Sequence, residues 1–297
     1  MTREQRTALA TELRAATHAP ERPSVEQLRV GFAAFMGTFA IPAGVRQTGT
    51  TLAGRRAVLV EPAGDAASGT ILYFHGGSFS LGSPETAMTL TANLVRRAGI
   101  RAFSLDYRLA PEHPFPAAIE DCVAAFRSLL ERGVDPDSIV FAGDSAGGGL
   151  TVTTCLAARD AGLPMPAAIV AFSPGLDHTR TGASMITKEG VDPFFTREGL
   201  GHTAQLYVGG QDPNQPLLAP AVFADLTGFP PILLQVGTNE LLLDDSVRLA
   251  ERARMAEVDV ILDITAGVPH VFQAWSESLD EADQALERAA LFIRQQV

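Results

Sequence analysis

Short β-branched runs alternate with longer amphipathic stretches from about Gly54 onward, and this alternation limits the folds open to the chain. Strands and helices that alternate along a sequence imply a mostly parallel sheet covered by helices on both faces. The runs IVFAG and ILLQVG are apolar enough to be buried on both sides, as strands of parallel sheets are. The expected strands are residues 57–61, 70–74, 102–106, 138–142, 167–172, 231–236 and 260–264.

The stretches between these strands have the period of amphipathic helices. In residues 116–131, four apolar side chains recur at spacings of four, three and four positions, so they share one face of a helix. These side chains are Ile119, Val123, Phe126 and Leu130. The expected helices are residues 86–98, 116–131, 147–161, 243–256 and 279–295.

Two segments do not follow the alternation: residues 1–48 and about 177–227. One interpretation is that they form helices packed on an open face of the core. The other is a cap over the carboxyl ends of the strands, where ligands bind in open α/β sheets. Aromatic residues of these segments are the candidates for contact with a substrate, namely Phe32, Phe35, Phe194 and Phe195.

Charge and cysteine content exclude several classes of function. The 34 acidic and 23 basic residues give a net charge of −11, which disfavours nucleic acid and anionic membranes as partners. No apolar run approaches the roughly 18 residues of a membrane-spanning helix. Cys122 and Cys155 are too few for a disulfide framework or a four-thiolate metal site, and they fit a reducing compartment. We therefore expect a cytoplasmic protein.

The pentapeptide GDSAG at residues 143–147 fits the pattern G-x-S-x-G and carries a candidate nucleophile, Ser145. It follows the apolar run SIVFA and opens a helical stretch, which is the strand–turn–helix setting that the motif requires. An ordinary glycine-rich turn is the alternative. Because the setting is complete, we interpret Ser145 as the nucleophile of a hydrolase.

A nucleophilic serine needs a base, and the chain has six histidines. His270 lies in a turn directly after the last apolar strand and follows Ser145 in the sequence. The order serine, acid, histidine is the order of α/β hydrolases. The sequence therefore predicts His270 as the base, with a solvated loop histidine as the alternative.

The third member of a triad is a carboxylate between the serine and the histidine. Glu240, Asp244 and Asp245 all follow the run PPILLQVG and compete for this role. Asp244 and Asp245 directly precede an amphipathic helix, where acids commonly cap free N–H groups or interact favourably with the helix dipole. Glu240 follows the strand by three residues and is better placed, so we predict it as the triad acid.

Two adjacent glycines, Gly76 and Gly77, follow the strand TILYF. Glycines without side chains let backbone N–H groups approach a developing oxyanion. The expected donors are the amides of Gly76, Gly77 and Ala146, the last being the residue after the nucleophile. His75 is expected to hold this loop by hydrogen bonds. No H-E-x-x-H, P-loop or clustered His/Cys motif is present, so the chemistry is expected to need no metal or cofactor.

Together these motifs resemble the hormone-sensitive-lipase-like family of α/β hydrolases, the bacterial family IV esterases. The resemblance covers nearly the whole chain and rests on HGGS at 75–78, DYRLAPEHPFPAAIED at 106–121, GDSAGG at 143–148, ELLLDD at 240–245 and the histidine turn at 266–270. It implies an α/β-hydrolase fold, with a mostly parallel eight-stranded sheet, helices on both faces and a helical cap. The cap corresponds to residues 1–48 and 177–227 of a single domain spanning residues 1–297.

The sequence departs from the family pattern at two positions. Ser78 stands where the family usually has a third glycine, and we expect function to survive because the first two glycines supply most of the donors. Glu240 stands where the family usually has aspartate. The change keeps the charge and adds one methylene.

We therefore expect a serine carboxylesterase. Ser145 attacks the ester carbonyl, His270 transfers the proton, and Glu240 orients the imidazole. The expected substrate is a small ester with a short or medium acyl chain, or a lactone. One alternative is a deacetylase acting on an O- or N-acetyl group of a specialised metabolite. Another is an inactive hydrolase fold that binds a ligand, which the complete set of serine, acid and histidine disfavours. A homodimer is left open.

Overall fold

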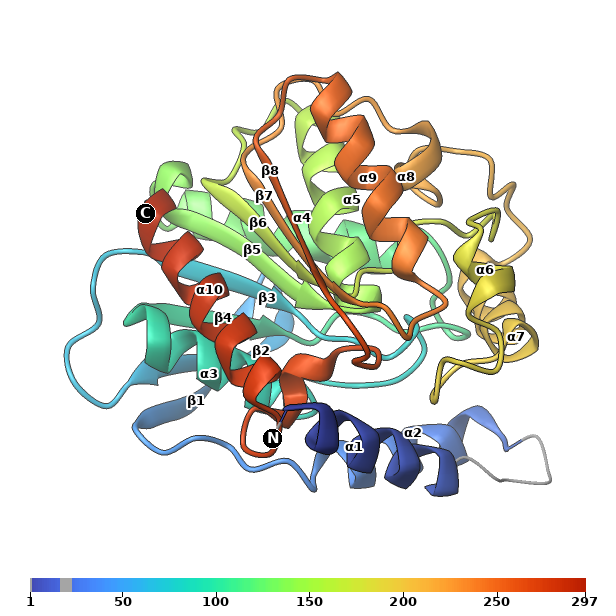
Figure 1. Ribbon diagram of the computed structural model, residues 1–297. Helices are drawn as coiled ribbons and strands as arrows, with labels where there is room; N and C mark the ends of the chain where they lie inside the picture. Colours follow the sequence, from blue (N-terminus) through green and yellow to red (C-terminus); the bar gives the residue numbers. More distant parts are fainter. Residues whose placement is uncertain (1, 17–22) are drawn as a thin grey trace.

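Eight strands form one sheet in the order β1-β2-β4-β3-β5-β6-β7-β8 in the computed structural model, which describes residues 2–16 and 23–297 (Figure 1). β2 pairs antiparallel with both β1 and β4, and all other neighbours pair in parallel. The mostly parallel eight-stranded sheet is therefore confirmed. The strands are β1 (Val45–Leu52), β2 (Arg55–Pro62), β3 (Thr70–Phe74), β4 (Arg101–Leu105), β5 (Ile139–Asp144), β6 (Ala168–Phe172), β7 (Ile232–Gly237) and β8 (Val260–Thr265).

Helices cover both faces of this sheet (Figure 1). α3 (Met88–Ala98) and α10 (Asp280–Gln296) pack against each other on one face. The other face is covered by α4 (Ala117–Glu131), α5 (Ala146–Asp160) and α9 (Leu243–Met255). All five expected helices form, with ends that differ from the prediction by at most two residues. None of the described helices is long and apolar enough to cross a membrane.

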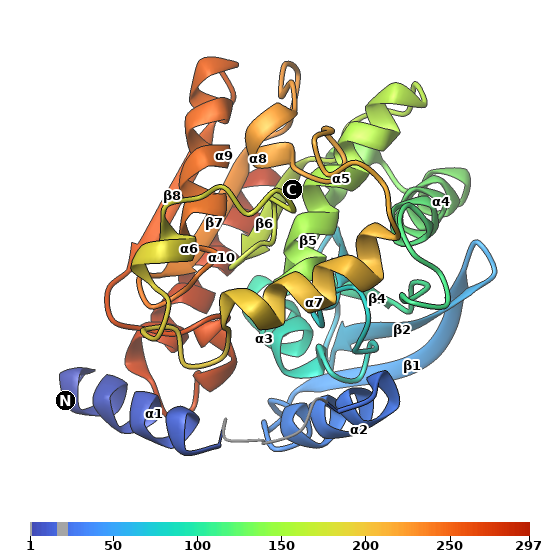
Figure 2. The same cartoon turned by 90° about the vertical axis from the view of Figure 1, so that its right-hand side faces the viewer.

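The two segments that break the alternation carry the remaining helices, and we call them the cap segments. In Figure 2, α7 crosses in front of the carboxyl ends of the strands, whereas α1 and α2 lie along one side. Met1 and residues 17–22 of the first expected segment lie outside the described residues. The cap helices are α1 (Thr2–Ala16), α2 (Val25–Met36), α6 (Ser184–Thr187), α7 (Arg197–Val208) and α8 (Pro220–Phe223), and two 3-10 turns, η1 (Pro136–Ser138) and η2 (Phe272–Trp275), lie elsewhere.

The first strand was not among the expected strands. β1 has the sequence VRQTGTTL and buries only Leu52, because it is the edge strand and its sole neighbour is β2. Its polar sequence lacks the apolar alternation that identifies the other strands. Residues 45–48, which the sequence assigned to the cap, therefore belong to the sheet. This boundary of the expected cap is wrong by about four residues.

Parallel strands in the middle of the sheet end at the same edge. Phe74 of β3 lies opposite Gly143 of β5, and Asp144 of β5 lies opposite Phe172 of β6. Phe172 in turn lies opposite Gln235 of β7. The loops that follow β3, β5, β6 and β7 therefore leave the sheet side by side, which is where open α/β sheets bind ligands.

Candidate active site

Ser145 lies on a tight turn between β5 and α5. Its φ of 53° and ψ of −118° are a conformation that a non-glycine residue adopts only under strain. The turn passes so close to β3 that a Cβ atom on Gly147 would lie 1.9 Å from the carbonyl oxygen of Phe74. Glycine is therefore required at position 147, and the turn presents the Ser145 hydroxyl at the edge of the sheet.

The structure brings together the three residues that the sequence predicts for the triad. The Ser145 Oγ atom lies 2.8 Å from Nε2 of His270. Nδ1 of the same imidazole lies 2.9 Å from Oε2 of Glu240. Both distances are those of hydrogen bonds, so the hydroxyl, the imidazole and the carboxylate form one continuous chain.

Glu240 is fully buried and is held at both carboxylate oxygens. Oε1 accepts hydrogen bonds from the Ser173 hydroxyl at 2.8 Å and from the amide of Gly237 at 2.5 Å. The Ser173 hydroxyl also accepts a hydrogen bond from the amide of Val271, the residue after the catalytic histidine, at 3.0 Å. Ser173 thus joins the acid to the histidine turn. Sequence analysis did not identify it, although its place directly after β6 is a usable signal.

The environment of His270 sets the pH range in which it can act as a base. Burial lowers the pKa of the imidazole, but the hydrogen bond and the negative charge of Glu240 act in the opposite direction. The carboxylates of Asp192 and Asp144 add to the effect of Glu240. The net result is a pKa raised above the ordinary value of 6.5.

Asp244 and Asp245 lie in the first turn of α9, as expected, but neither side chain caps its free amides, so the capping role is wrong. Oδ2 of Asp244 accepts the amide of Ser184 in α6 at 2.9 Å. Oδ2 of Asp245 accepts the amides of Leu176 and Asp177, at 2.7 and 3.0 Å. Both carboxylates therefore hold the segment that follows β6. The sequence could not show this because their partners lie about 60 to 70 residues away along the chain.

Gly76 is not available as an oxyanion donor, which corrects one of the predicted residues. Its amide donates to Oδ1 of Asp144 at 3.1 Å, and the Tyr73 hydroxyl donates to the same oxygen at 2.9 Å. Asp144 is the residue before the nucleophile, so it ties the oxyanion loop to the serine turn. A Cβ on Gly76 would lie 2.1 Å from this carboxylate, and glycine is needed here for the close approach.

Three other amides are available near the nucleophile. Among the described residues, none accepts a hydrogen bond from the backbone N–H groups of Gly77, Ser78 or Ala146. Gly77 and Ala146 were predicted donors, whereas Ser78 was noted only as a departure from the family pattern. Ser78 and Ala146 line the same cavity as Ser145. The donor set that the geometry favours is thus shifted by one residue from the predicted one.

His75 has the structural role expected of it. The ring is fully buried, its Nδ1 lies 2.8 Å from the carbonyl oxygen of Gly76, and it stacks on Tyr107 with centroids 4.1 Å apart. Burial lowers its pKa to about 4, so the imidazole is neutral at physiological pH. His75 therefore supports the oxyanion loop and takes no part in the hydrogen bonds of the triad.

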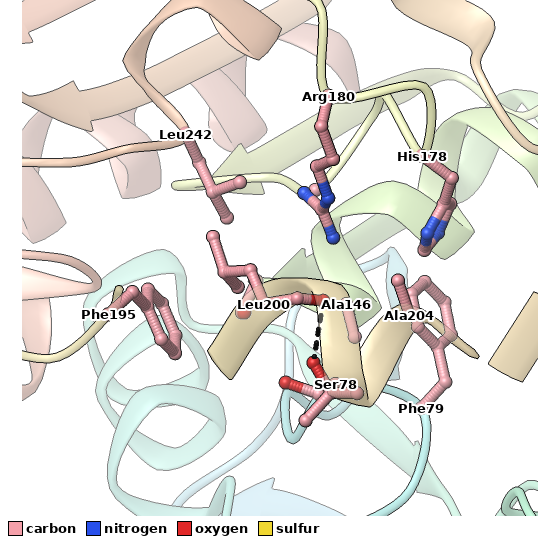
Figure 3. A pocket seen from close by; sticks show the side chains of 12 residues that line it. Ser78, Phe79, Ala146, His178, Arg180, Phe195, Leu200, Ala204 and Leu242 are labelled. Atoms are coloured by element: carbon pink, nitrogen blue, oxygen red, sulfur yellow. Dashed lines mark hydrogen bonds between the residues drawn. The ribbon is translucent and has the colours of Figure 1, made fainter. Parts of the chain in front are cut away.

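The cavity beside Ser145 is narrow, and residues of the cap segments close it (Figure 3). It leaves about 20 Å³ for a water-sized sphere, slightly more than the roughly 10–15 Å³ that one water needs. Phe195 and Leu200 line it from the second cap segment. The Phe195 ring meets the His270 ring edge-on at 4.8 Å, so this predicted contact residue does lie beside the catalytic base.

The other three predicted contact residues lie elsewhere. Phe35 and Phe194 pack with Trp275, at ring distances of 6.4 and 5.8 Å. Phe35 also lines a second cavity of about 550 Å³ between α2, α3 and η2, which does not contain Ser145. Phe32 is half-buried on α2 and lines neither of these two cavities. In this structure only Phe195 of the four reaches the nucleophile's cavity.

The described part of the chain offers no group of three or more His, Cys, Asp or Glu side chains placed to hold a metal ion. The reactive groups that the structure brings together are the Ser145 hydroxyl, the His270 imidazole and the Glu240 carboxylate. A hydroxyl hydrogen-bonded to a neutral imidazole, beside free backbone amides, can carry out acyl transfer through a covalent intermediate.

Comparisons with known proteins identify the family to which the chain is related. Residues 71–274 match a family model described as alpha/beta hydrolase fold. An acetyl-hydrolase of Streptomyces hygroscopicus is 44% identical over 225 residues, which cover 76% of this chain and 75% of the relative. An esterase of Acinetobacter venetianus is 36% identical over 228 residues, with 76% and 75% covered.

Solved structures extend the likeness to the whole fold. The crystal structure of an esterase from the bacterial hormone-sensitive lipase family is 39% identical, with a TM-score of 0.94 and 99% of this chain and 98% of that chain covered. A hormone-sensitive lipase from a metagenome library is 41% identical, with a TM-score of 0.95 and 98% of both chains covered. The chain therefore belongs to the alpha/beta hydrolase fold family, and the likeness to its bacterial hormone-sensitive-lipase-like esterases is confirmed.

Proposed function

We propose that this serine esterase hydrolyses small carboxylic esters through an acyl-enzyme, with Ser145, His270 and Glu240 as its triad. The observation that carries the proposal is the unbroken hydrogen-bond chain from the Ser145 hydroxyl through His270 to the buried Glu240 carboxylate. A ligand-binding protein without activity has no need of this arrangement. We therefore set aside the inactive alternative.

The first half of the reaction forms the acyl-enzyme. Ser145 Oγ attacks the carbonyl carbon while Nε2 of His270 takes the hydroxyl proton. The Nδ1–H group donates to Glu240, which fixes the tautomer and stabilises the imidazolium that forms. The amides of Gly77, Ser78 and Ala146 donate to the oxyanion. His270 then passes the proton to the leaving alcohol, and the C–O bond breaks.

The second half repeats these steps with water. His270 takes a proton from the water molecule, hydroxide attacks the acyl carbon, and Ser145 leaves with the proton restored to its hydroxyl. Each oxyanion donor is worth about 2.7–4 kcal/mol of activation free energy in other hydrolases. The choice of Ser78 in place of Gly76 as a donor therefore matters for the rate.

The narrow cavity supports short acyl groups as substrates. Phe195, Leu200 and Leu242 surround the space beside the nucleophile and leave little room for a long chain. The test is kcat/KM for p-nitrophenyl esters from C2 to C12, with Ser145→Ala as the blank. We expect C2 to C4 esters, and small lactones, to be hydrolysed far better than C12. A preference for emulsified long-chain triglyceride would contradict the proposal.

Deacetylation is the second candidate. It is supported by the small cavity and by the likeness to the Streptomyces hygroscopicus protein named acetyl-hydrolase. Acetate release from matched O-acetyl and N-acetyl compounds separates the two bonds. A carboxylesterase cleaves the O-acetyl compound much faster than the N-acetyl compound, whereas a dedicated amide deacetylase does not.

A cytoplasmic location is proposed on the acidic charge of the chain and on its thiols. Cys122 and Cys155 are both free and buried, as suits a reducing compartment. Cell fractionation with an antibody to the protein tests this location.

A further inference from the structure

A cationic side chain with no hydrogen-bond or ion-pair partner among the described residues lines the catalytic cavity. Arg180, in the loop between β6 and α6, lines the cavity together with Ser145 and Ala146. In Figure 3 its side chain points from this loop into the cavity, toward Ala146. Its Nε atom is shielded from solvent and has no acceptor, and its guanidinium makes no hydrogen bond or ion pair with any described residue. A buried charged donor without an acceptor is costly, so it calls for an explanation.

The nearest carboxylates are committed to other donors. Asp177 accepts hydrogen bonds from the amides of Thr179 and Thr181 and pairs with Arg248 at 2.9 Å. Asp245 accepts the amides of Leu176 and Asp177. Their negative charges act on Arg180 through space. Neither carboxylate, however, takes up the donors of its guanidinium.

The loop that carries Arg180 has a defined backbone conformation. The hydrogen bonds to Asp177 close the turn around residues 177–181, and Arg180 has a φ of 55°, in the left-handed region. Burial lowers the pKa of Arg180, but a guanidinium keeps its proton in proteins. The neighbouring His178 is neutral, because burial lowers its pKa to about 3. Arg180 therefore contributes a positive charge to the lining of the cavity.

We propose that Arg180 binds a carboxylate of the substrate, so that the natural substrate is a short ester with an anionic group close to the scissile bond. The inference rests on the proposed esterase function and names its substrate class. A guanidinium can bind a carboxylate through two parallel hydrogen bonds, which fixes orientation as well as charge. Because the whole chain carries a net charge of −11, any preference for anions must come from such a local cation.

The substrate carboxylate can lie in the acyl part or in the alcohol part of the ester. Two pairs of substrates distinguish these two positions. Monoethyl succinate and ethyl butyrate differ by a carboxylate at the end of the acyl chain. O-acetyl-lactate and O-acetyl-lactamide each have one ester bond and differ by a carboxylate in the alcohol part. We expect kcat/KM, measured by pH-stat, to favour the anionic member of one pair by on the order of 100-fold.

Variants then assign the preference to Arg180. Arg180→Gln should reduce the ratio of anionic to neutral kcat/KM to about one, and Arg180→Lys should keep part of it. Arg197→Gln is the matched control, since it removes an exposed positive charge of the same cap segment and should leave the ratio unchanged. If Arg180→Gln lowers both kcat/KM values equally, Arg180 has only a structural role and the proposal is wrong.

Inhibition of the wild-type enzyme gives an answer even if the Arg180 variants fail to fold. Butyrate ion should compete with ethyl butyrate on the order of 100-fold better than neutral butyramide does. Equal inhibition by the two compounds, together with equal kcat/KM within both ester pairs, overturns the anionic substrate but leaves the esterase intact. Failure to hydrolyse any of the four esters would instead refute the proposed function itself.

Discussion

The sheet edge and the cap segments both reach the catalytic cavity, but they are held in place in different ways. Nine of the eleven residues of α3, which packs on the sheet, are buried. No residue of α2 is buried, and α7 buries only Leu200 and Tyr207 among its twelve residues. The triad lies on loops anchored in the densely packed region. Phe195 and Leu200 close the cavity from the sparsely packed one.

This difference in packing assigns the catalytic residues to the sheet edge and the selection of substrate to the cap segments. Ser145, Glu240 and His270 are positioned by strand ends whose core packing fixes them. Most side chains of α7 are not buried, so replacing these costs less stability than replacing the core side chains of α3. Changes at the sheet edge should therefore abolish turnover, whereas changes in the cap segments should alter the choice of substrate.

The strongest test of the sheet edge is Ser145→Ala. It removes the nucleophile and is expected to lower kcat by about 10⁶-fold, as in other serine hydrolases. The melting temperature should stay near that of the wild type, because the hydroxyl's hydrogen bond is with the catalytic imidazole. Turnover close to the wild-type rate by a folded variant would contradict the triad.

Glu240→Gln tests the acid. The amide favours the wrong imidazole tautomer, and the matching change in a serine protease lowered kcat by about 10⁴-fold. Asp244→Asn is the control, because Asp244 holds the amide of Ser184 and the amide oxygen of asparagine can still accept it. We expect the control to change kcat by less than about threefold. If Asp244→Asn is inactive and Glu240→Gln remains active, Asp244 is the triad acid and the assignment of Glu240 is wrong.

Ser173→Ala measures how much the support of the triad contributes. It removes one of two donors to Oε1 of Glu240 and leaves the amide of Val271 without its acceptor. Such a loss costs about 1–3 kcal/mol, so kcat/KM should fall by about 5- to 150-fold. Ser173→Thr keeps the hydroxyl and should restore part of the activity. A purely structural role would instead lower the melting temperature without a change in kcat.

The pH dependence of kcat/KM reports the pKa of His270, to which carboxylates of both the sheet edge and the cap segments contribute. His270 accepts a proton only when neutral, and its pKa is raised, so kcat/KM should fall about tenfold per pH unit below a midpoint that lies above 6.5. Asp192 of the cap segment contributes less to this rise than Glu240 of the sheet edge. Asp192→Asn should therefore lower the midpoint slightly. A midpoint below 6.5 in the wild type would contradict the geometry.

The smallest expected effect is a change in acyl-chain preference caused by a substitution in the cap segments. Phe195→Ala widens the cavity beside His270 and should raise kcat/KM for C6 to C8 esters relative to C2 by up to about tenfold. Phe35→Ala is the matched control, because Phe35 packs on Phe39 and Trp275 and lines the other cavity. The same shift in both variants would show that the first cap segment also selects the acyl chain.

Sequence reasoning succeeded where a feature is encoded locally. The turn around Ser145 follows from its glycines and from the strand and helix on either side, and the order of the triad follows from the chain. The sequence did not reveal that the amide of Gly76 is bound, because Asp144 lies 68 residues away. It missed α7, whose Gly199 and Gly201 weaken the helical pattern. It also gave no signal that Arg180 lies in the cavity.

The carboxylate of Asp144 links the oxyanion loop after β3 to the nucleophile turn after β5, so the two loops cannot be exchanged separately. It accepts hydrogen bonds from Tyr73 at the end of β3 and from Gly76 in the following loop, while its own backbone leads into Ser145. The oxyanion loop and the nucleophile turn therefore form one structural unit that has to be kept together. A chimera with another hydrolase should have its crossover points outside residues 73–147, because a junction between the loops separates Asp144 from its donors.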